Sequence, residues 1–301
     1  MWQQLLTGIQ EQDQRALARS ISCVENEVPG FESFLSQLPV GHAAVTGITG
    51  PPGAGKSTLV DALIAEWVSK HKKVGVLCVD PSSPFNLGAV LGDRIRMSEW
   101  YNHPNVFIRS LATRGALGGL HPHIIDITAL MQAAGFDHII VETVGVGQSE
   151  IEIAGLADTT VVVVVPEAGD EVQTMKAGLM EIADIFVVNK SDRPEADLFV
   201  KNLRMMLAPA FHHSTTEIPV IKTVATAKTG LPELANAIEQ HQAEEHHSDR
   251  KDWLLTERAW KLIQQKRMKD LNKQMLKEKI ASLRKDKEFN LFGFVQTYIN
   301  P

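Results

Sequence analysis

The sequence has little cysteine and no long apolar run. Cys23 and Cys78 are the two cysteines in 301 residues, and neither has a partner at metal-ligand spacing. This argues against a disulfide framework and a zinc cage, and Cys78 is expected to be a small buried strand residue. No stretch approaches the roughly 20 apolar residues that a membrane helix requires, and the first residues form neither a basic leader nor an apolar signal core. We therefore expect a cytoplasmic protein with no membrane partner.

The composition allows one sizeable core and leaves residues over for appendages. Hydrophobic residues make up 44% of the chain and charged residues 22%, which favours one main domain with helical extensions. The net charge of −6 is unevenly distributed. Residues 250–287 hold 13 Lys/Arg and 5 Asp/Glu, a net charge of +8, which leaves −14 for the rest of the chain. The C-terminal region is therefore basic and the remainder acidic.

Short apolar runs rich in β-branched residues recur along the chain and are typical of strands. They cover residues 43–49, 74–80, 105–111, 138–144, 159–165, 185–190 and 219–225. Helix-patterned segments lie between most of them, such as 56–70 and 171–180. This alternation predicts an α/β fold, with a mainly parallel central sheet and helices on both faces. The run of five valines at 161–165 predicts a central strand that is buried on both sides.

Both ends of the chain have helical patterns. We expect an N-terminal helical extension over residues 1–40, a nucleotide-binding domain over 41–245 and a C-terminal helical arm over 246–301. Pro29 and Gly30 break the first helical pattern, and the arm has no strand-like run before its last few residues. The apolar residues with helical spacing are, in the N-terminal extension, Leu5, Leu6, Ile9, Leu17, Ile21 and Val24, and, in the arm, Met268, Leu271, Met275, Leu276, Ile280 and Leu283.

A glycine-rich phosphate-binding loop lies between the first predicted strand and the helix that follows. Gly50 is followed after four residues by Gly55, Lys56 and Ser57, which is the P-loop spacing in its required strand–loop–helix context. Glycines let backbone N–H groups face phosphates, and the helix N-terminus adds partial positive charge. Lys56 is expected to reach the β- and γ-phosphates, and the Ser57 hydroxyl to bind Mg²⁺. The predicted nucleotide-binding residues here are Gly50, Pro51, Pro52, Gly53, Ala54, Gly55, Lys56, Ser57 and Thr58.

A second motif predicts that the base is guanine. Asn189, Lys190, Ser191 and Asp192 follow a buried-looking strand, where the Asp192 carboxylate can accept hydrogen bonds from guanine N1 and N2. Adenine cannot supply that pair of donors. Thr226, Ala227 and Lys228 follow the last predicted strand and are expected to pack on the base from the other side.

Carboxylates at other strand ends are candidates for the metal site and for parts that respond to the nucleotide. Glu142 is positioned to hold a Mg²⁺-bound water, and the backbone N–H of Gly145 to sense the γ-phosphate. Asp80 ends a strand, and Asp93 follows a glycine-containing stretch. Lys56, Asp80, Asp93 and Glu142 are thus the catalytic candidates, and Ser57 joins the three carboxylates as a metal ligand. Val146 stands where many small GTPases carry a water-orienting glutamine, which predicts slow intrinsic hydrolysis.

Together these motifs resemble the G-protein chaperones of methylmalonyl-CoA mutase, the MeaB/ArgK type of SIMIBI-class P-loop GTPase, over nearly the whole chain. The segments that carry the resemblance are VDPSSP, LGDRIRM, RSLATRGALGGL, VETVGVGQSE and PEAGDEVQTMKAGLMEIADIFVVNKSD. The resemblance implies GTP/GDP and Mg²⁺ binding, with GTP hydrolysis that gates adenosylcobalamin delivery to a cobalamin-dependent acyl-CoA mutase and protects that enzyme. It also implies that residues 167–176 form an additional switch and that the C-terminal arm forms a homodimer.

Other functions stay open at this stage. One is a protein kinase of an amino-acid (arginine/ornithine) transport system, and another is a non-catalytic GTP-dependent assembly scaffold. His121 and His123 would be compatible with a metal-delivery role. They lie on either side of Pro122, however, and a proline is also common at the start of a helix. The positive charge of the arm is compatible with nucleic-acid binding, whereas Trp253 and Trp260, which lie among the charged residues, favour a helix interface.

Overall fold

The computed structural model describes residues 1–80, 97–113, 120–143, 149–166, 177–207, 218–244, 249–269, 271–285 and 289–299. The chain divides into two compact units, Met1–Lys251 and Asp252–Pro301. The first unit contains all the nucleotide-binding motifs found in the sequence.

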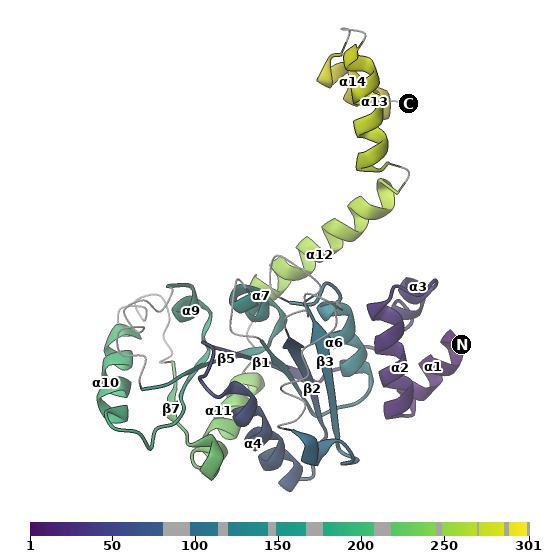
Figure 1. Cartoon of the computed structure of the whole chain (residues 1–301). Coiled ribbons are helices and arrows are strands. Elements are labelled where there is room, and N and C mark those ends of the chain that lie inside the picture. The colour runs from purple at the N-terminus through teal and green to yellow at the C-terminus, as the bar shows by residue number, and fades with distance from the viewer. Residues whose placement is uncertain are drawn as a thin grey trace. The chain divides into compact units, whose positions relative to one another are not determined.

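The first unit is built on one seven-stranded sheet (Figure 1). Its strands are β1 (Ala44–Thr49), β2 (Val74–Asp80), β3 (Val106–Ala112), β4 (His138–Glu142), β5 (Thr159–Val164), β6 (Ile185–Val188) and β7 (Val220–Lys222). Each lies within one of the seven predicted segments, or extends one residue beyond it. Every residue of β2, β4, β5 and β6 is buried, including Cys78. Four of the five valines, 161–164, therefore lie in a strand covered on both faces, as predicted, and Val165 follows the strand.

All strand pairs in the sheet are parallel, in the order β3-β2-β4-β1-β5-β6-β7. This confirms the predicted α/β fold. The first strand lies in the middle, so the order reverses beside β1. In open parallel sheets, ligands bind outside the carboxyl ends of the strands near such a reversal. The phosphate-binding motif begins at the carboxyl end of β1.

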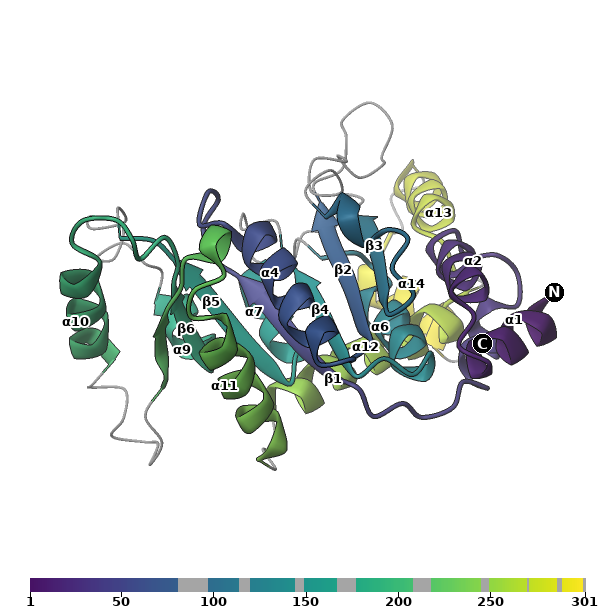
Figure 2. The same ribbon diagram turned by 90° about the horizontal axis from the view of Figure 1, so that it is seen from below.

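Helices cover both faces of the sheet (Figure 2). On one face α4 (Lys56–Ser69) and α11 (Leu231–Ala243) share a core with Ile48, Val76 and Val163. On the other face α7 (Ser149–Leu156), α9 (Ala177–Ile182) and α10 (Ala196–Leu207) pack around Val162, Phe186 and their neighbours. The short 3-10 turn Ser98–Trp100 is fixed to α4 by a hydrogen bond of 2.8 Å from Trp100 Nε1 to Asp61 Oδ1.

The N-terminal helices α1 (Trp2–Gln10), α2 (Gln14–Glu25) and α3 (Phe31–Leu35) lie beside α6 (Ile124–Ala133). All six apolar residues predicted to face inward from this extension are buried. Gly30, at the expected break, has a φ of 93° and is the cap residue immediately before α3. The Arg109 guanidinium on β3 donates to Ser22 Oγ at 3.0 Å and forms an ion pair with Glu25, which ties α2 to the sheet.

The helix α12 (Asp249–Arg267) begins in the first unit, where Arg250 Nη1 donates to the Ile182 carbonyl at 3.2 Å and Lys251 Nζ lies 2.6 Å from Asp158 Oδ1. The second unit holds the rest of α12, then α13 (Lys273–Lys285) and α14 (Leu291–Ile299). The strand-like run at the end of the sequence is thus helical and lies in α14. No residue of α13 is buried.

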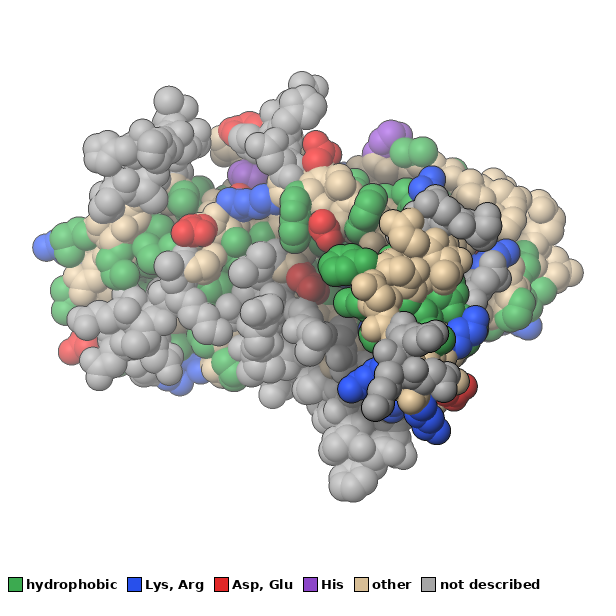
Figure 3. Space-filling model, turned by 90° about the horizontal axis from the view of Figure 1, so that it is seen from above, with side chains coloured by type: hydrophobic (Ala, Val, Ile, Leu, Met, Phe, Trp, Pro, Cys, Tyr) green, Lys and Arg blue, Asp and Glu red, His purple; other side chains and the backbone are tan. Residues whose placement is uncertain are grey.

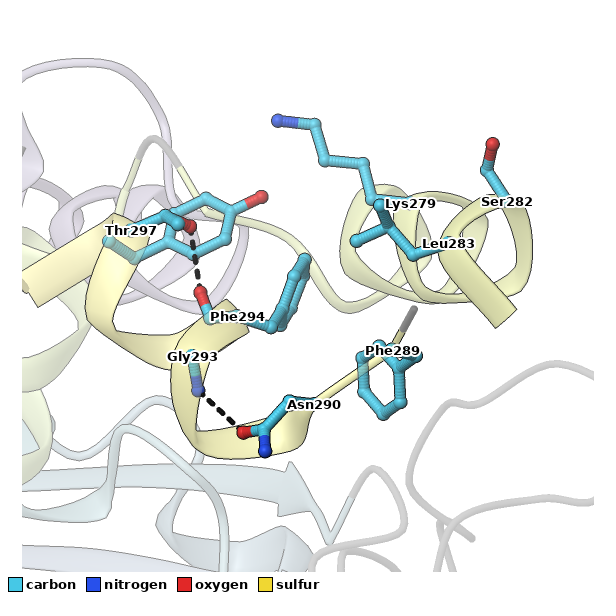
Figure 4. Close-up of a pocket in the computed structure, with 9 residues that line it drawn as sticks. Lys279, Ser282, Leu283, Phe289, Asn290, Gly293, Phe294 and Thr297 are labelled. Atoms are coloured by element: carbon cyan, nitrogen blue, oxygen red, sulfur yellow. Dashed lines mark hydrogen bonds between the residues drawn. The ribbon is translucent and has the colours of Figure 1, made fainter. Parts of the chain in front are cut away.

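Within the second unit a groove of about 480 Å³ separates α13 from α14 (Figure 4). Phe289, Phe294 and Tyr298 form an aromatic row along it, with ring centroids 5.9 Å and 5.2 Å apart. Lys279 Nζ lies 5.3 Å from the Tyr298 ring centre, within reach of a cation–π contact. The groove is far in sequence from the nucleotide motifs and contains none of their residues.

Candidate nucleotide site

The phosphate loop leaves β1 at Thr49 and enters α4 at Lys56. Gly50 has a φ of 139°, and a Cβ there would lie 2.1 Å from the Val163 carbonyl oxygen. Gly55 has a φ of 88°, and a Cβ there would lie 2.5 Å from Asn189 Nδ2. Only glycine fits these positions, because the backbone is left-handed and the neighbours are in contact. The loop is therefore a backbone cradle held open between β5 and the end of β6.

Lys56 is 7% exposed and its ammonium group bends back over the loop. Its Nζ donates to the Gly50 carbonyl at 2.9 Å and to the Pro51 carbonyl at 3.2 Å. A buried ammonium needs oxygen partners, and in this position the loop supplies them. The side chain is thus held within the cradle, where a phosphate oxygen can exchange for a carbonyl.

Three oxygen-bearing side chains are buried at strand or helix ends on the edge of the sheet from which the phosphate loop leaves β1. Ser57 Oγ donates to Glu142 Oε1 at 2.7 Å. Glu142 ends β4, and Asp80 ends the adjacent strand β2, where Cys78 is the register partner of Glu142. Their exposed fractions are 6%, 3% and 4% for Ser57, Glu142 and Asp80. A hydroxyl and two carboxylates are the hard oxygen donors that Mg²⁺ prefers, so this set fits that ion.

The second motif meets the phosphate loop directly. Asn189 is 2% exposed, and its Nδ2 donates to the Ala54 carbonyl at 2.9 Å. Lys190 has a φ of 56° and its Nζ donates to the Gly53 carbonyl at 2.9 Å. Asn189 and Lys190 therefore bridge from the end of β6 to the loop that begins after β1. The phosphate and base motifs, some 135 residues apart in sequence, form one site.

The remaining residues predicted to surround the base lie on exposed loops. Asp192 is exposed, and so are Thr226, Ala227 and Lys228. The loop that holds Thr226, Ala227 and Lys228 contains the 3-10 turn Ala225–Ala227. It is closed by paired backbone hydrogen bonds between Val224 and Thr229. The backbone N–H of Ser191 donates to the Thr223 carbonyl at 3.0 Å, which joins the two loops. An accessible carboxylate on a fixed loop can accept hydrogen bonds from a ligand.

Several predicted residues lie outside the described part of the chain. They are Asp93, Gly145, Val146 and the segment 167–176. Thr223, which orders both loops, was missed in the sequence. The predicted strand 219–225 placed Thr223 inside the strand, whereas β7 ends at Lys222, so that Thr223 follows the strand end as Asn189 does.

One of the two histidines beside Pro122, His123, has contacts that give it a structural role. His123 is the cap residue of α6, as the predicted helix start requires. Its Nδ1 lies 2.8 Å from Asp126 Oδ2, and its Nε2 lies 3.0 Å from Glu27 Oε1. His123 therefore links α6 to the N-terminal helices. Within the described ranges, no three His, Cys, Asp or Glu side chains are grouped to hold a metal ion.

This combination of fold and site defines the class: the protein is a P-loop GTPase. A family model described as "Methylmalonyl Co-A mutase-associated GTPase MeaB" matches residues 17–280. The chain belongs to the MeaB family.

Known relatives agree with this assignment. A Pyrococcus abyssi protein that carries a GTPase name is 49% identical over 80% of this chain and 76% of its own. GTPase ArgK of Escherichia coli is 36% identical over 76% of this chain and 72% of its own. A mitochondrial methylmalonic aciduria type A homolog of Caenorhabditis elegans is 45% identical over 48% of this chain and 37% of its own. A solved structure named LAO/AO transport system kinase has a TM-score of 0.68 and 25% identity, covering 98% of this chain and 95% of its own.

Proposed function

We propose that this GTPase binds GTP with Mg²⁺, hydrolyses it and serves as a chaperone of a cobalamin-dependent acyl-CoA mutase of the methylmalonyl-CoA mutase type. In this proposal the nucleotide cycle gates adenosylcobalamin delivery and protects the mutase. The observation that carries the nucleotide part is the direct bonding of Asn189 and Lys190 to the phosphate loop. The partner is supported by the family description and by the name of the Caenorhabditis elegans relative.

In the proposed site each group has a separate task. The N-terminus of α4 and the loop amides bind the phosphates, and Lys56 balances their charge. Ser57, Asp80 and Glu142 would hold Mg²⁺, with Asp93 as a further candidate ligand. When bound there, the ion would supply positive charge to neutralise the phosphates. Asp192 accepts hydrogen bonds from the guanine edge, while Thr226, Ala227 and Lys228 border the base.

The C-terminal arm, residues 246–301, is proposed to join two copies of the chain. Trp253 and Trp260 are 62% and 58% exposed and lie seven residues apart on α12, so both face the same side of the helix. Large apolar side chains in such a row favour a helix interface.

We also propose that the protein works in the cytoplasm. No helix in the described ranges has the length and apolar character needed to cross a membrane.

The test is a reconstitution with purified protein, a candidate mutase and adenosylcobalamin. GTP turnover is expected to be slow alone and faster with the mutase, and cofactor loading of the mutase is expected to require GTP. If the mutase does not change the rate of GTP turnover, and this GTPase does not change cofactor loading of the mutase, the client assignment is wrong. Arg15→Ala, an exchange on α2 away from the nucleotide site, is the control for non-specific effects of purification.

A kinase is the second candidate, because the similar solved structure carries that name. The fate of the γ-phosphate separates the two activities. With γ-labelled GTP, release as inorganic phosphate supports the GTPase, and a stable label on a transport-system protein supports the kinase. If the protein is a scaffold, Lys56→Ala should weaken partner binding and partner function equally. If it is a GTPase chaperone, Lys56→Ala should abolish partner function while partner binding remains.

A further inference from the structure

The helix α4 and the strand β4 are in contact at both of their ends. At the carboxyl edge of the sheet, Ser57 in the first turn of α4 donates from Oγ to Oε1 of Glu142, which ends β4, at 2.7 Å. At the amino edge, Trp67 in the last turn of α4 stacks on His138, which begins β4. The ring centroids lie 4.2 Å apart, and the ring planes are inclined by 9°. One contact belongs to the proposed Mg²⁺ site, and the other lies at the opposite end of the same two elements.

The two stretches of chain between these contacts have matching lengths. Trp67 follows Ser57 by ten residues, which corresponds to about 15 Å of helix at about 1.5 Å per residue. Glu142 follows His138 by four residues, which corresponds to about 13 Å of strand at about 3.3 Å per residue. Because the two lengths agree to within about 2 Å, both contacts can form at once without distortion of either element.

The side chains between the two contacts lie along one seam. Alternate residues of a strand share a face, so His138, Ile140 and Glu142 lie on one face of β4. On α4, Val60 and Ile64 lie between the two contacts with helical spacing, and both are fully buried in the same core cluster as Ile140. A close-packed seam transmits a shift of one element along the other. A change of register at the amino edge would therefore reach the pair at the carboxyl edge.

Trp67 is also held by a third element. Its side chain is fully buried, and its Nε1 donates to Oε1 of Glu239 on α11 at 2.8 Å. A buried indole N–H needs such a partner, so the indole cannot slide along the His138 ring without losing a hydrogen bond. The stack therefore has one fixed arrangement.

We propose that the Trp67–His138 stack is a positioning contact for Mg²⁺ binding, which sets the register of α4 on β4 and thereby the placement of Ser57 against Glu142. The inference rests on the proposed nucleotide site, in which Ser57 and Glu142 are two of the oxygen donors for the ion. Mg²⁺ demands near-ideal octahedral geometry. A small displacement of one donor should therefore weaken Mg²⁺ binding more than it weakens phosphate binding, which Lys56 and several loop amides share.

The test separates Mg²⁺ binding from nucleotide binding in the full-length protein. GTP binding is titrated with Mg²⁺, and also measured in EDTA, for the wild type, His138→Val and His138→Phe. His138→Val removes the ring and keeps a residue that suits a strand, whereas His138→Phe keeps a flat ring on Trp67. His138→Val is expected to raise the half-saturating Mg²⁺ concentration about three- to tenfold, less than is typical for direct neighbours of metal ligands. GTP binding in EDTA should stay the same, and His138→Phe should restore the Mg²⁺ value.

Two further variants distinguish positioning from a general loss of stability. Glu239→Ala changes a partly exposed side chain and removes the hydrogen-bond partner of Trp67. It should give a smaller shift in the same direction while the protein stays folded. Phe136→Leu is the matched control, because it breaks a second aromatic pair, with Phe107 at 6.2 Å, and leaves the Trp67 stack intact. It should lower the unfolding midpoint without changing the Mg²⁺ requirement.

An unchanged Mg²⁺ requirement in His138→Val would overturn the inference, as would a His138→Phe variant that behaves like His138→Val. An equal loss of GTP binding with Mg²⁺ and in EDTA, or the same Mg²⁺ shift in Phe136→Leu, would also overturn it by making the stack merely structural. Failure of the underlying site gives a different result, because GTP binding by the wild type would then not depend on Mg²⁺.

Discussion

The two units of the chain bury their apolar residues to very different extents. In Met1–Lys251 the large side chains Trp67, Phe34 and Phe186 are almost completely buried. In Asp252–Pro301, Phe292 is 81% exposed and no residue of α13 is buried. Exposed hydrophobic side chains are also visible among charged ones in the space-filling view (Figure 3). The first unit therefore has its own core, whereas the second presents a surface that another chain can cover.

The strongest test of this contrast replaces the buried Trp67. Its indole packs on the His138 ring at 4.2 Å and donates to Glu239 Oε1 at 2.8 Å. Trp67→Ala is expected to lower the free energy of unfolding by about 3–5 kcal/mol, because it leaves a large cavity. Urea unfolding measures the effect, and Trp67→Phe should lose less. A change below about 1 kcal/mol would contradict the assignment of Trp67 to the core.

A second test concerns chemistry in the first unit. Lys56→Ala is expected to reduce GTP turnover by about 10²- to 10³-fold, as for other groups that stabilise transition-state charge. Its unfolding midpoint should stay near that of the wild type. Lys70→Ala is the matched control, since Lys70 follows the same helix and pairs with Glu66 at the surface at 3.3 Å. Similar turnover in the two variants would remove Lys56 from the mechanism.

Acidification should also act on the first unit. Burial lowers the pKa of His138 from its ordinary value of 6.5, and nearby Glu239 and Asp137 only partly oppose this. At pH values between the folded and unfolded pKa of His138, the unfolded chain binds more protons than the folded protein. The stability of the folded protein therefore rises with pH in this range. The contribution is fully present above about pH 6.5 and is lost as the pH falls through the folded pKa. Unfolding midpoints at pH 7.5 and 5.5 should differ less in His138→Gln than in wild type, with exposed His71→Gln as control.

The smallest effect on stability is expected in the second unit. Replacing Trp253 and Trp260 together by Ser should change the free energy of unfolding by no more than about 0.5 kcal/mol per site, because both are surface side chains. The same variant should shift a dimer toward monomer in light scattering. Leu198→Ser, an exposed apolar position on α10, is the control. Persistence of the dimer in the double variant would show that α12 does not form the interface.

The sequence was most informative where burial alone determines structure. Strands such as Thr159–Val164 could be located because β-branched residues on both faces have few alternatives to a covered parallel strand. The inward side of the N-terminal helices was equally clear, since Leu17, Ile21 and Val24 repeat with helical spacing. The final apolar run was ambiguous, because the periodicity of a short apolar segment suits a strand as well as a helix.

Contacts between distant segments could not be predicted from the sequence. The bond from Lys190 to Gly53 depends on the sheet order, which brings β6 near β1 through β5. The same holds for the Ser57 to Glu142 bond and for the ordering of Asn189 by Thr223. The motifs predicted which residues matter, and the fold determines which of them touch.

The most direct measurement is calorimetric titration of the full-length protein with GTP and ATP in magnesium buffer, repeated with Asp192→Asn. The account predicts much tighter binding of GTP by the wild type and a reduced preference in Asp192→Asn, because an amide cannot accept both guanine hydrogen bonds. Equal affinity for the two nucleotides, or a preference that survives the exchange, would contradict the claim that the two motifs form one guanine nucleotide site.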